Sequence, residues 1–321
     1  MKDSRRDTLV YGARIKDNTV LRESTSGGLF IAFSDIVIEN GGFVCGAVYS
    51  REHEVKHIIT SQKQIRDKMR GAKYVQSNLG NVVRDVIKHL NAGECVLFVG
   101  TPCQVSALKK VVSIKSNDDK LITIDIVCHG VPSPGIFKQH VSYIENKYGK
   151  IKSYLFRDKQ KGWRGQNVTI TTETGVVPDE DAKLFSSLYF NSLIIRPSCF
   201  ECPFSSIVRE GDITISDFWG IANENSKYDD NRGISTVMIN SKKGNDLFET
   251  IKDNIDYFKV NSDSYIQPNM KRPTERSIVA DSFWKVYNKK GLGGAKGFLK
   301  NLKYRMLPYR IKNKLCRLIQ K

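Results

Sequence analysis

Four of the seven cysteines in this 321-residue chain stand where a redox or metal centre could use their sulfur atoms. Cys103 lies in a Gly-Thr-Pro-Cys-Gln run and Cys128 in a Val-Cys-His-Gly run. Cys199 and Cys202 form a CxxC pair that Pro203 follows directly. Thiolates are the ligands that zinc and iron–sulfur clusters use most. A fold that brings these three segments together would therefore present four thiolates to one metal centre.

Two of these cysteines follow apolar runs that are typical of strands buried on both faces, at 95–99 and 121–127. A helix is predicted over 104–112, so the segment has the order strand, helix, strand of a parallel βαβ unit. Both strands of such a unit end at the same edge of the sheet. Cys103 and Cys128 are therefore expected at the carboxyl edge, where open α/β sheets bind their ligands.

The cysteine spacing alone does not identify the centre. Ferredoxins place their ligands in one short run, and zinc ribbons use two CxxC pairs, so buried structural cysteines remain an alternative. The position of Cys103 just ahead of a helix favours a thiolate, because the helix dipole and free N–H groups stabilise it. Cys45 and Cys95 fall inside apolar strand runs and are predicted to fill the core. Cys316 lies in the basic tail and has no predicted role.

Two other segments and one histidine are candidates for ligand binding or catalysis. The turn Ser26-Gly27-Gly28 precedes a helix predicted over 29–38, and such a turn can hold an anion or admit a planar ring. A second segment could hydrogen-bond to and stack on a flavin, or form a solvated turn; its residues are Lys73, Tyr74, Gln76 and Ser77. His129 is a candidate catalytic proton donor, although a single histidine in a turn often has a structural role.

The order of predicted elements indicates an α/β fold with a mixed, partly parallel sheet and flanking helices. We expect one large catalytic unit followed by a basic C-terminal helical tail, because 321 residues exceed the usual size of one small domain. Residues 1–150 would form the flavin-binding region with the first two cysteines. Residues 151–280 would form a second α/β region, in which a helix over 185–194 leads to the CxxC pair, and 281–321 the tail.

The positive charge is concentrated in that tail. The net charge is +17, and 281–321 holds twelve Lys or Arg and one acid, or +11, which leaves +6 for the first 280 residues. A nucleic-acid partner is therefore not expected. The tail carries an apolar stripe that predicts a helix resting on an anionic membrane surface or packing on its own domain. The stripe consists of Ile311, Leu315, Leu318 and Ile319.

Composition also indicates where the protein works. No stretch reaches the roughly 18–20 apolar residues that span a bilayer, and the charged N-terminus lacks the apolar core of a signal peptide. We expect a cytoplasmic protein, because reduced thiols suit that compartment, and the tail offers it a peripheral contact with the inner face of the membrane. An odd number of cysteines without paired spacing does not suggest a disulfide framework.

Taken together, residues 24–240 resemble the beta subunit family of coenzyme F-420 hydrogenases and dehydrogenases. The resemblance rests on these runs in this order: Ser24-Thr-Ser-Gly-Gly28, Gly41-Gly-Phe-Val-Cys-Gly-Ala47, Lys73-Tyr-Val-Gln-Ser77, Gly100-Thr-Pro-Cys-Gln104, Cys128-His-Gly-Val-Pro-Ser-Pro134, Ser198-Cys-Phe-Glu-Cys202 and Asp212-Ile-Thr-Ile-Ser-Asp-Phe-Trp-Gly220. Members of this family are iron–sulfur flavoproteins that pass electrons between a 4Fe-4S cluster, FAD and a deazaflavin or another acceptor.

The resemblance implies specific roles for residues of this chain. It implies that Cys103, Cys128, Cys199 and Cys202 are the ligands of a 4Fe-4S cluster. It also implies a pocket for FAD, built by Ser26, Gly27, Gly28, Lys73, Tyr74, Gln76, Ser77, Gly100, Thr101, Pro102 and Gln104. The expected function is to relay electrons between cluster and flavin and so reduce or oxidise a small substrate or a deazaflavin-type cofactor.

The sequence departs from many relatives, which begin with a ferredoxin-like domain that carries two further clusters. We therefore expect a form without that domain, with a separate ferredoxin-type protein as electron donor. Relatives in bacteria that lack the deazaflavin often occur among surface-polysaccharide genes, so such a pathway is a candidate setting. One alternative is a non-redox scaffold with a structural zinc on the same four cysteines. Another is a peripheral membrane partner that has lost its cofactor, although retention of all four cysteines argues against it.

Overall fold

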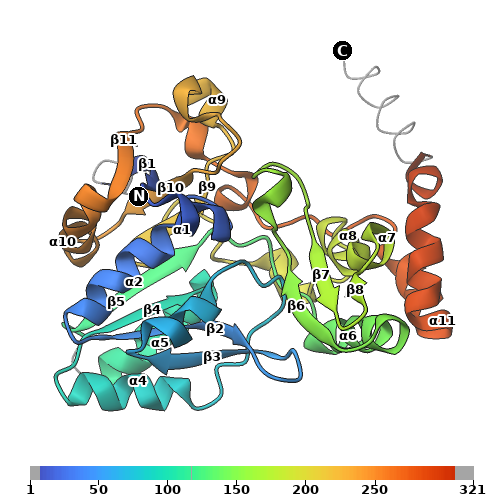
Figure 1. The fold of residues 1–321 in the computed structure, drawn as a ribbon, viewed down its shortest axis with the longest axis horizontal. Coiled ribbons are helices and arrows are strands. Elements are labelled where there is room, and N and C mark those ends of the chain that lie inside the picture. The colour runs from blue at the N-terminus through green and yellow to red at the C-terminus, as the bar shows by residue number, and fades with distance from the viewer. Residues whose placement is uncertain (1–7, 117, 308–321) are drawn as a thin grey trace.

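The computed structural model describes residues 8–116 and 118–307. Eight strands form the main sheet in the order β11-β1-β10-β9-β5-β4-β2-β3 (Figure 1). Their bounds are β1 Leu9–Ile15, β2 Phe43–Tyr49, β3 Val55–Thr60, β4 Val96–Gly100, β5 Leu121–Ile126, β9 Ile213–Asp217, β10 Ser235–Ile239 and β11 Ile255–Lys259. A second sheet has three strands, β6 Ile151–Leu155, β7 Thr169–Thr172 and β8 Gly175–Val176.

Helices cover both faces of the main sheet, as its apolar central strands require. The α-helices are α1 Asn18–Glu23, α2 Leu29–Glu39, α3 Lys63–Arg66, α4 Val82–Asn91, α5 Pro102–Lys115, α6 Pro134–Tyr148, α7 Asp179–Ala182, α8 Leu184–Phe190, α9 Ile221–Glu224, α10 Lys242–Ile251 and α11 Ala280–Lys300. Apolar side chains of α2 and α10 pack on one face of the sheet, and those of α4 and α5 on the other. The predicted α/β class, with a mixed sheet and flanking helices, is confirmed.

The strands at the centre of the sheet are parallel. β2 pairs with β4, β4 with β5 and β5 with β9, all in parallel. β10 and β1 then follow in antiparallel pairs, so β1 runs in the same direction as the parallel strands. The carboxyl ends of β1, β2, β4, β5 and β9 consequently lie along one edge, and β10 begins there. We call this the carboxyl edge.

Two predicted helix boundaries differ from the structure. The helix expected over 104–112 is α5, which begins at Pro102 with Thr101 as its N-cap and a capping box to Gln104. Proline suits the first helical position because its fixed φ is already helical, so Cys103 lies within the first turn of α5. The helix expected over 185–194 is α8, which ends at Phe190, and Ser192 beyond it has φ 55°.

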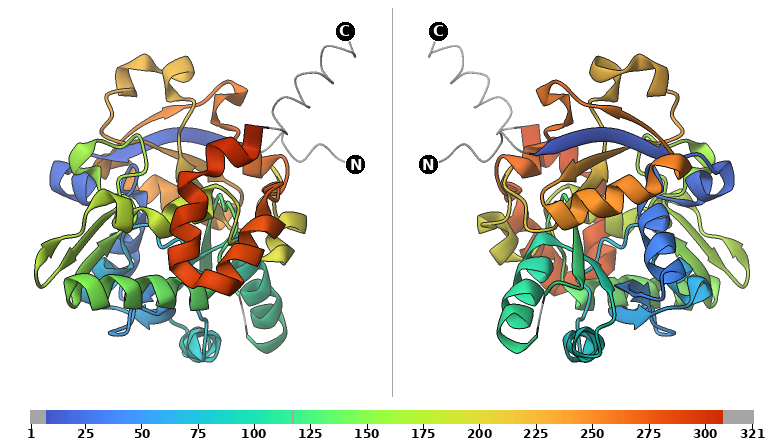
Figure 2. Two further views of the ribbon diagram at one scale, coloured as in Figure 1. Left: turned by 90° about the vertical axis from the view of Figure 1, so that its right-hand side faces the viewer. Right: turned by 90° about the vertical axis from the view of Figure 1, so that its left-hand side faces the viewer.

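The second sheet and the C-terminal helix share a separate core. It is built from α6, α8, α11 and the strands β6 and β7, and its fully buried side chains include Phe137, Phe185 and Phe298. In the left view of Figure 2, α11 lies in red across the face turned to the viewer. It bends at Gly291, which has φ 54°.

The described part of the tail is therefore a packed element of the molecule. The apolar stripe predicted at Ile311, Leu315, Leu318 and Ile319 lies outside the described residues, as does Cys316. Among the helices that the structure describes, none combines the length and the apolar character needed to cross a bilayer.

Candidate functional site

The carboxyl edge gathers the segments that carry the four predicted cysteines. Cys103 follows β4 in the first turn of α5, where its Sγ lies 3.1 Å from Thr101 Oγ1. Cys128 follows β5, and its Sγ accepts a hydrogen bond of 3.3 Å from the N–H of Gly130. The CxxC pair comes from a different direction, through the 3₁₀ turn Pro197–Glu201.

Contacts between backbone segments hold the CxxC pair against Cys128. The N–H of Arg196 donates to the carbonyl of Val131 over 3.0 Å, and the N–H of Cys199 to that of Arg196 over 2.9 Å. Gly130 has φ +110°, and a Cβ on it would lie 3.2 Å from Cys199 Cβ. The positive φ and this close approach both favour glycine at position 130.

Burial and neighbouring thiols act on the pKa values of Cys128 and Cys199. Burial raises the pKa of Cys128 to about 12; the Gly130 hydrogen bond opposes this shift, and the nearby Cys103, Cys199 and Cys202 thiols add to it. Burial likewise raises the pKa of Cys199, with further contributions from Cys202 and Cys103. The cysteines from three distant stretches are thus neighbours. No three His, Cys, Asp or Glu side chains in 8–116 and 118–307 converge closely enough to hold a metal ion.

The predicted flavin segments meet beside Cys103. Gln104 Nε2 donates to Ser77 Oγ over 2.8 Å, and Gln104 Oε1 accepts from the N–H of Thr101 over 3.0 Å. Gln76 Oε1 accepts a hydrogen bond from Arg196, which lies three residues before Cys199. The structure therefore brings the stretch 73–77 together with the turn 100–104 and with the CxxC segment.

Tyr74 and His129 belong to one aromatic cluster next to Cys128. Tyr74 stacks on Tyr189, with ring centroids 5.2 Å apart, and His129 meets Tyr189 edge-on at 5.3 Å. His129 Nδ1 lies 3.3 Å from Asn269 Oδ1, and its buried Nε2 has no hydrogen-bond partner among the described residues. Burial lowers the pKa of His129, against the effect of Asn269. The imidazole is therefore neutral near pH 7.

The Ser26–Gly28 turn packs on the sheet. A Cβ on Gly27 would lie 2.4 Å from the carbonyl oxygen of Ala13 in β1 and 2.8 Å from the backbone nitrogen of Ser235 in β10. The N–H of Gly27 already donates to Ser235 Oγ over 2.9 Å. Gly27 thus allows a close backbone approach, while the carbonyl of Ser26 accepts a 2.7 Å hydrogen bond from Lys159.

A cavity of about 1260 Å³ opens beside this turn, which exceeds the roughly 300–1,000 Å³ of most small-ligand pockets. Its walls come from α1, the turn after β2, the stretch 67–73 and the stretch 151–160. Eight basic and three acidic residues line it. The basic residues are Arg22, Arg51, Lys68, Arg70, Lys73, Lys152, Arg157 and Lys159, and the acidic ones Glu23, Asp67 and Asp158. The cavity is suited to an anionic ligand.

Of these cations, only Lys73 was predicted from the sequence to bind a ligand. The others do not lie in a recognisable local motif. Burial lowers the pKa of both Lys73 and Lys159 to about 8. The buried hydroxyls of Tyr49 and Tyr154, which also line the cavity, have no hydrogen-bond partner in the described part of the chain. The cavity therefore offers both charge and unused polar groups to a ligand.

Arg157 connects the cavity to the end of β9. Its guanidinium donates to the carbonyl of Trp163 over 2.9 Å and to Asp217 over 3.4 Å. The indole of Trp163 donates to Asp217 over 2.7 Å and stacks on Trp219 with centroids 4.8 Å apart. Trp219, 40% exposed, also lies under Arg157.

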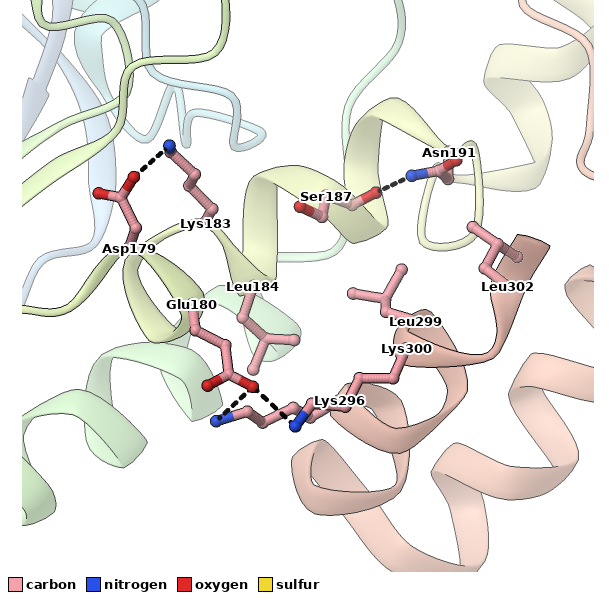
Figure 3. Close-up of a pocket in the computed structure, with 10 residues that line it drawn as sticks. All are labelled: Asp179, Glu180, Lys183, Leu184, Ser187, Asn191, Lys296, Leu299, Lys300 and Leu302. Atoms are coloured by element: carbon pink, nitrogen blue, oxygen red, sulfur yellow. Dashed lines mark hydrogen bonds and ion pairs between the residues drawn. The ribbon is translucent and has the colours of Figure 1, made fainter. Parts of the chain in front are cut away.

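A smaller cavity of about 460 Å³ lies between α7, α8 and α11 (Figure 3). Glu180 forms ion pairs there with Lys296 and Lys300, at 3.4 and 3.0 Å. None of the residues that line it is a predicted site residue. Its ion pairs join α11 to α7 and have a structural role.

Comparison with known proteins places the chain in a family. Residues 93–262 match the family described as the C terminus of the beta subunit of coenzyme F420 hydrogenase/dehydrogenase. A comparison with curated protein sequences found no match to the chain. A chain of the F420-reducing [NiFe] hydrogenase complex from Methanosarcina barkeri has a similar fold, with a TM-score of 0.52, 18% sequence identity and 92% of each chain covered. The chain therefore belongs to the coenzyme F420 hydrogenase/dehydrogenase beta subunit family, which is a family of oxidoreductases.

Proposed function

We propose that this chain is an iron–sulfur flavoprotein oxidoreductase, in which Cys103, Cys128, Cys199 and Cys202 hold a 4Fe-4S cluster. The observation that carries the proposal is that the segments bearing these four cysteines meet at the carboxyl edge, where Gly130 contacts Cys128 Sγ and packs against Cys199. Family membership supports a redox role.

A 4Fe-4S cluster and a structural zinc ion both accept four cysteine thiolates. We favour the cluster because the chain belongs to a family of oxidoreductases. The N–H of Gly130, which is directed at Cys128 Sγ, is the kind of donor that tunes the potential of a cluster through its sulfur ligands.

We further propose that FAD occupies the basic cavity, where it would exchange single electrons with the cluster and electron pairs with a substrate. Lys73, Arg70 and Lys159 would bind its diphosphate. The isoalloxazine ring would be bordered by Tyr74 and by the turns at Ser26 to Gly28 and 100–104. Hydrogen bonds of Gln76, Ser77 and Gln104 would hold these segments in place. The support for this assignment is the excess of cations in the cavity, together with Lys73 and Thr25 in its walls, which directly adjoin Tyr74 and Ser26.

His129 would hold a proton for the reaction. Asn269 Oδ1 can only accept, so the contact to Nδ1 favours the tautomer with its proton on that nitrogen. Nε2 then has a free lone pair, and the neutral ring is suited to accept a proton there and return it. Thr274 donates a 2.6 Å hydrogen bond to the His129 carbonyl and so fixes the backbone of this turn.

The proposed partners follow from the exposure of the site. Cys103 is exposed, so a ferredoxin-type donor would approach the cluster at the first turn of α5. The oxidised or reduced compound would be a small substrate or a deazaflavin-type cofactor, in a surface-polysaccharide pathway for example. The basic tail would supply a contact with anionic membrane lipids.

Anaerobic purification followed by a visible spectrum and by iron, sulfide and flavin analysis tests the proposal. We expect a brown protein with flavin bands and with iron and sulfide in equal amounts. A colourless protein that contains one zinc ion would overturn the proposal and support the scaffold alternative.

A further inference from the structure

A buried ion pair joins the segments that carry Cys128 and Cys202. Asp125 lies in β5, three residues before Cys128, and its side chain is fully buried. Arg209 follows the CxxC pair by seven residues, and its side chain is 1% exposed. Arg209 Nη2 lies 3.2 Å from Asp125 Oδ2. Arg209 is thus a fully buried cation on a loop that starts at a predicted cluster ligand.

The guanidinium of Arg209 contacts backbone on both sides of the loop. Nη1 donates to the carbonyl of Ser206 over 3.0 Å and to that of Phe204 over 3.4 Å. Nη2 donates to the carbonyl of Ile126 at the end of β5 over 3.2 Å. One planar group therefore ties the loop after Cys202 to the strand that precedes Cys128.

Asp125 is held equally firmly. Its carboxylate accepts hydrogen bonds from Thr214 Oγ1 over 2.5 Å and from the N–H of Glu210 over 3.2 Å. Thr214 lies in β9, so the pair connects β5, β9 and the loop. A buried ion pair contributes little net stability compared with apolar residues of the same size. The planar guanidinium of Arg209 instead fixes the relative positions of several hydrogen-bond acceptors at once.

We propose that Asp125 and Arg209 are positioning residues that hold the Cys202 thiol next to Cys128, so that both can bind one cluster. This inference rests on the proposed function. Neither residue touches the cluster or a substrate; both act through the loop. A lysine at 209 would keep the charge but could not contact Asp125 and the three carbonyls together.

The test measures two quantities, the iron retained after anaerobic purification and the rate at which a maleimide labels Cys202 in metal-free, reduced protein. Labelling is located by mass spectrometry. The variants are Arg209→Lys and the double variant Asp125→Asn/Arg209→Met, which removes both charges and so leaves no unpaired buried ion. Arg66→Lys is the matched control, because Arg66 is a buried arginine that pairs with Asp35 on α2.

We expect faster labelling of Cys202 and loss of iron in Arg209→Lys and in the double variant, with cooperative unfolding preserved in both. The Arg66→Lys control should show neither effect. Wild-type labelling rates in both Arg209 variants would overturn the inference, as would iron loss without a change in labelling. If the wild-type protein binds no iron, the proposed function fails, while the labelling rates still decide whether this ion pair positions Cys202.

Discussion

At the scale of single residues, the local sequence separates two groups of cysteines. One group lies in or next to apolar strand runs, and the other lies beyond the ends of strands. Cys45 lies within β2 and is fully buried, so its predicted place in the core is confirmed. Cys95 differs from the prediction, because it precedes β4 and is only partly buried. Cys103 lies in the first turn of α5 beyond β4, and Cys128 lies in the segment beyond β5, so both stand past strand ends as predicted. The roles of Arg209 and Lys159 could not be predicted, because their contacts join residues that are far apart in the chain, such as Lys159 and Ser26.

Serine substitutions distinguish the proposed ligands from the other cysteines. Cys103→Ser should abolish the broad absorption of the cluster, since serine does not replace a thiolate on iron. Cys95→Ser should preserve it, because Cys95 precedes β4 and so lies at the opposite end of that strand from Cys103. Visible spectra of both variants, purified anaerobically, check this. Loss of absorption only in Cys95→Ser would discard the ligand assignment.

The two lysines with lowered pKa predict how flavin binding depends on pH. Lys73 and Lys159 are charged below about pH 8 and lose their protons above it. Because the phosphates of FAD attract the charged form, the affinity for FAD should be constant well below that pH and fall as the pH rises through it. Fluorescence titration of free FAD against the flavin-free protein at several pH values measures this dependence.

A variant shows whether these lysines cause the pH effect. Lys159→Met should weaken FAD binding near neutral pH and flatten its decline at higher pH. Lys152→Met removes an exposed cation from the same cavity and is the matched control. A wild-type pH profile in Lys159→Met would rule out Lys159 as its source.

At the scale of elements, periodicity predicted the βαβ unit correctly because β4, α5 and β5 are contiguous and regular. It predicted a helical tail but did not show that α11 is packed on the core. Residues 291–297 contain four glycines, which have low helix propensity, and the helix is stabilised by burial of Ala295 and Phe298 instead. Tertiary packing of this kind is not visible in local propensity. The Ser26–Gly28 turn was predicted, but its contact with β10 joins residues about 200 positions apart.

Two glycine-to-alanine changes test whether the turn is part of the fold. Gly27→Ala should lower the unfolding temperature, since overpacking costs about 1–3 kcal/mol and its Cβ would meet backbone atoms. Gly293→Ala places a methyl where no atom lies within 4 Å and should stabilise α11 by about 0.5–1 kcal/mol. Thermal unfolding followed by circular dichroism compares the two. Equal effects would contradict the packing role of Gly27.

Asp181 joins α7 to α6 and α11. Its carboxylate, 2% exposed, accepts hydrogen bonds from Lys147 at 2.8 Å, Lys296 at 2.7 Å and Tyr148 at 2.7 Å. Burial opposes its ionisation, but these bonds together lower its pKa below the usual range. The stabilisation is present above about pH 4 and disappears as pH falls and the carboxylate is protonated.

Asp181→Asn should therefore cost about 1–3 kcal/mol of unfolding free energy at neutral pH, and the difference from wild type should shrink below about pH 4. Urea unfolding at several pH values measures both. Asp179→Asn is the control, since the exposed pair of Asp179 with Lys183 contributes less than about 1 kcal/mol. A constant difference at all pH values would contradict an ionised Asp181.

At the scale of the whole molecule, the basic cavity lies between the main sheet and the second sheet. Its walls thus come from both cores, and a ligand in it contacts both. The composition of the chain and its apolar runs predicted the fold class, but no local feature indicated that β6 would face α1 and the stretch 67–73. This arrangement depends on packing across the two cores.

Two truncations separate the packed part of the tail from the rest. Ending the chain after Lys290 removes Ala295 and Phe298 from the core, and full burial of one such aromatic contributes about 1.5–3 kcal/mol, so the unfolding temperature should drop. Ending it after Leu307 should leave that temperature and the spectrum unchanged while reducing sedimentation with anionic vesicles. If the full-length chain does not sediment with such vesicles, the proposed membrane contact is wrong.

The stacked indoles beside Arg157 give the protein a built-in optical probe. Two of its three tryptophans, Trp163 and Trp219, form that stack, and the third, Trp284, lies on α11. Replacing Trp284 with phenylalanine would confine tryptophan emission to this stack, which contacts the cavity residue Arg157. An isoalloxazine absorbs at those wavelengths, so binding of the proposed flavin should quench this emission and its release should restore it, without a dye attached to the chain.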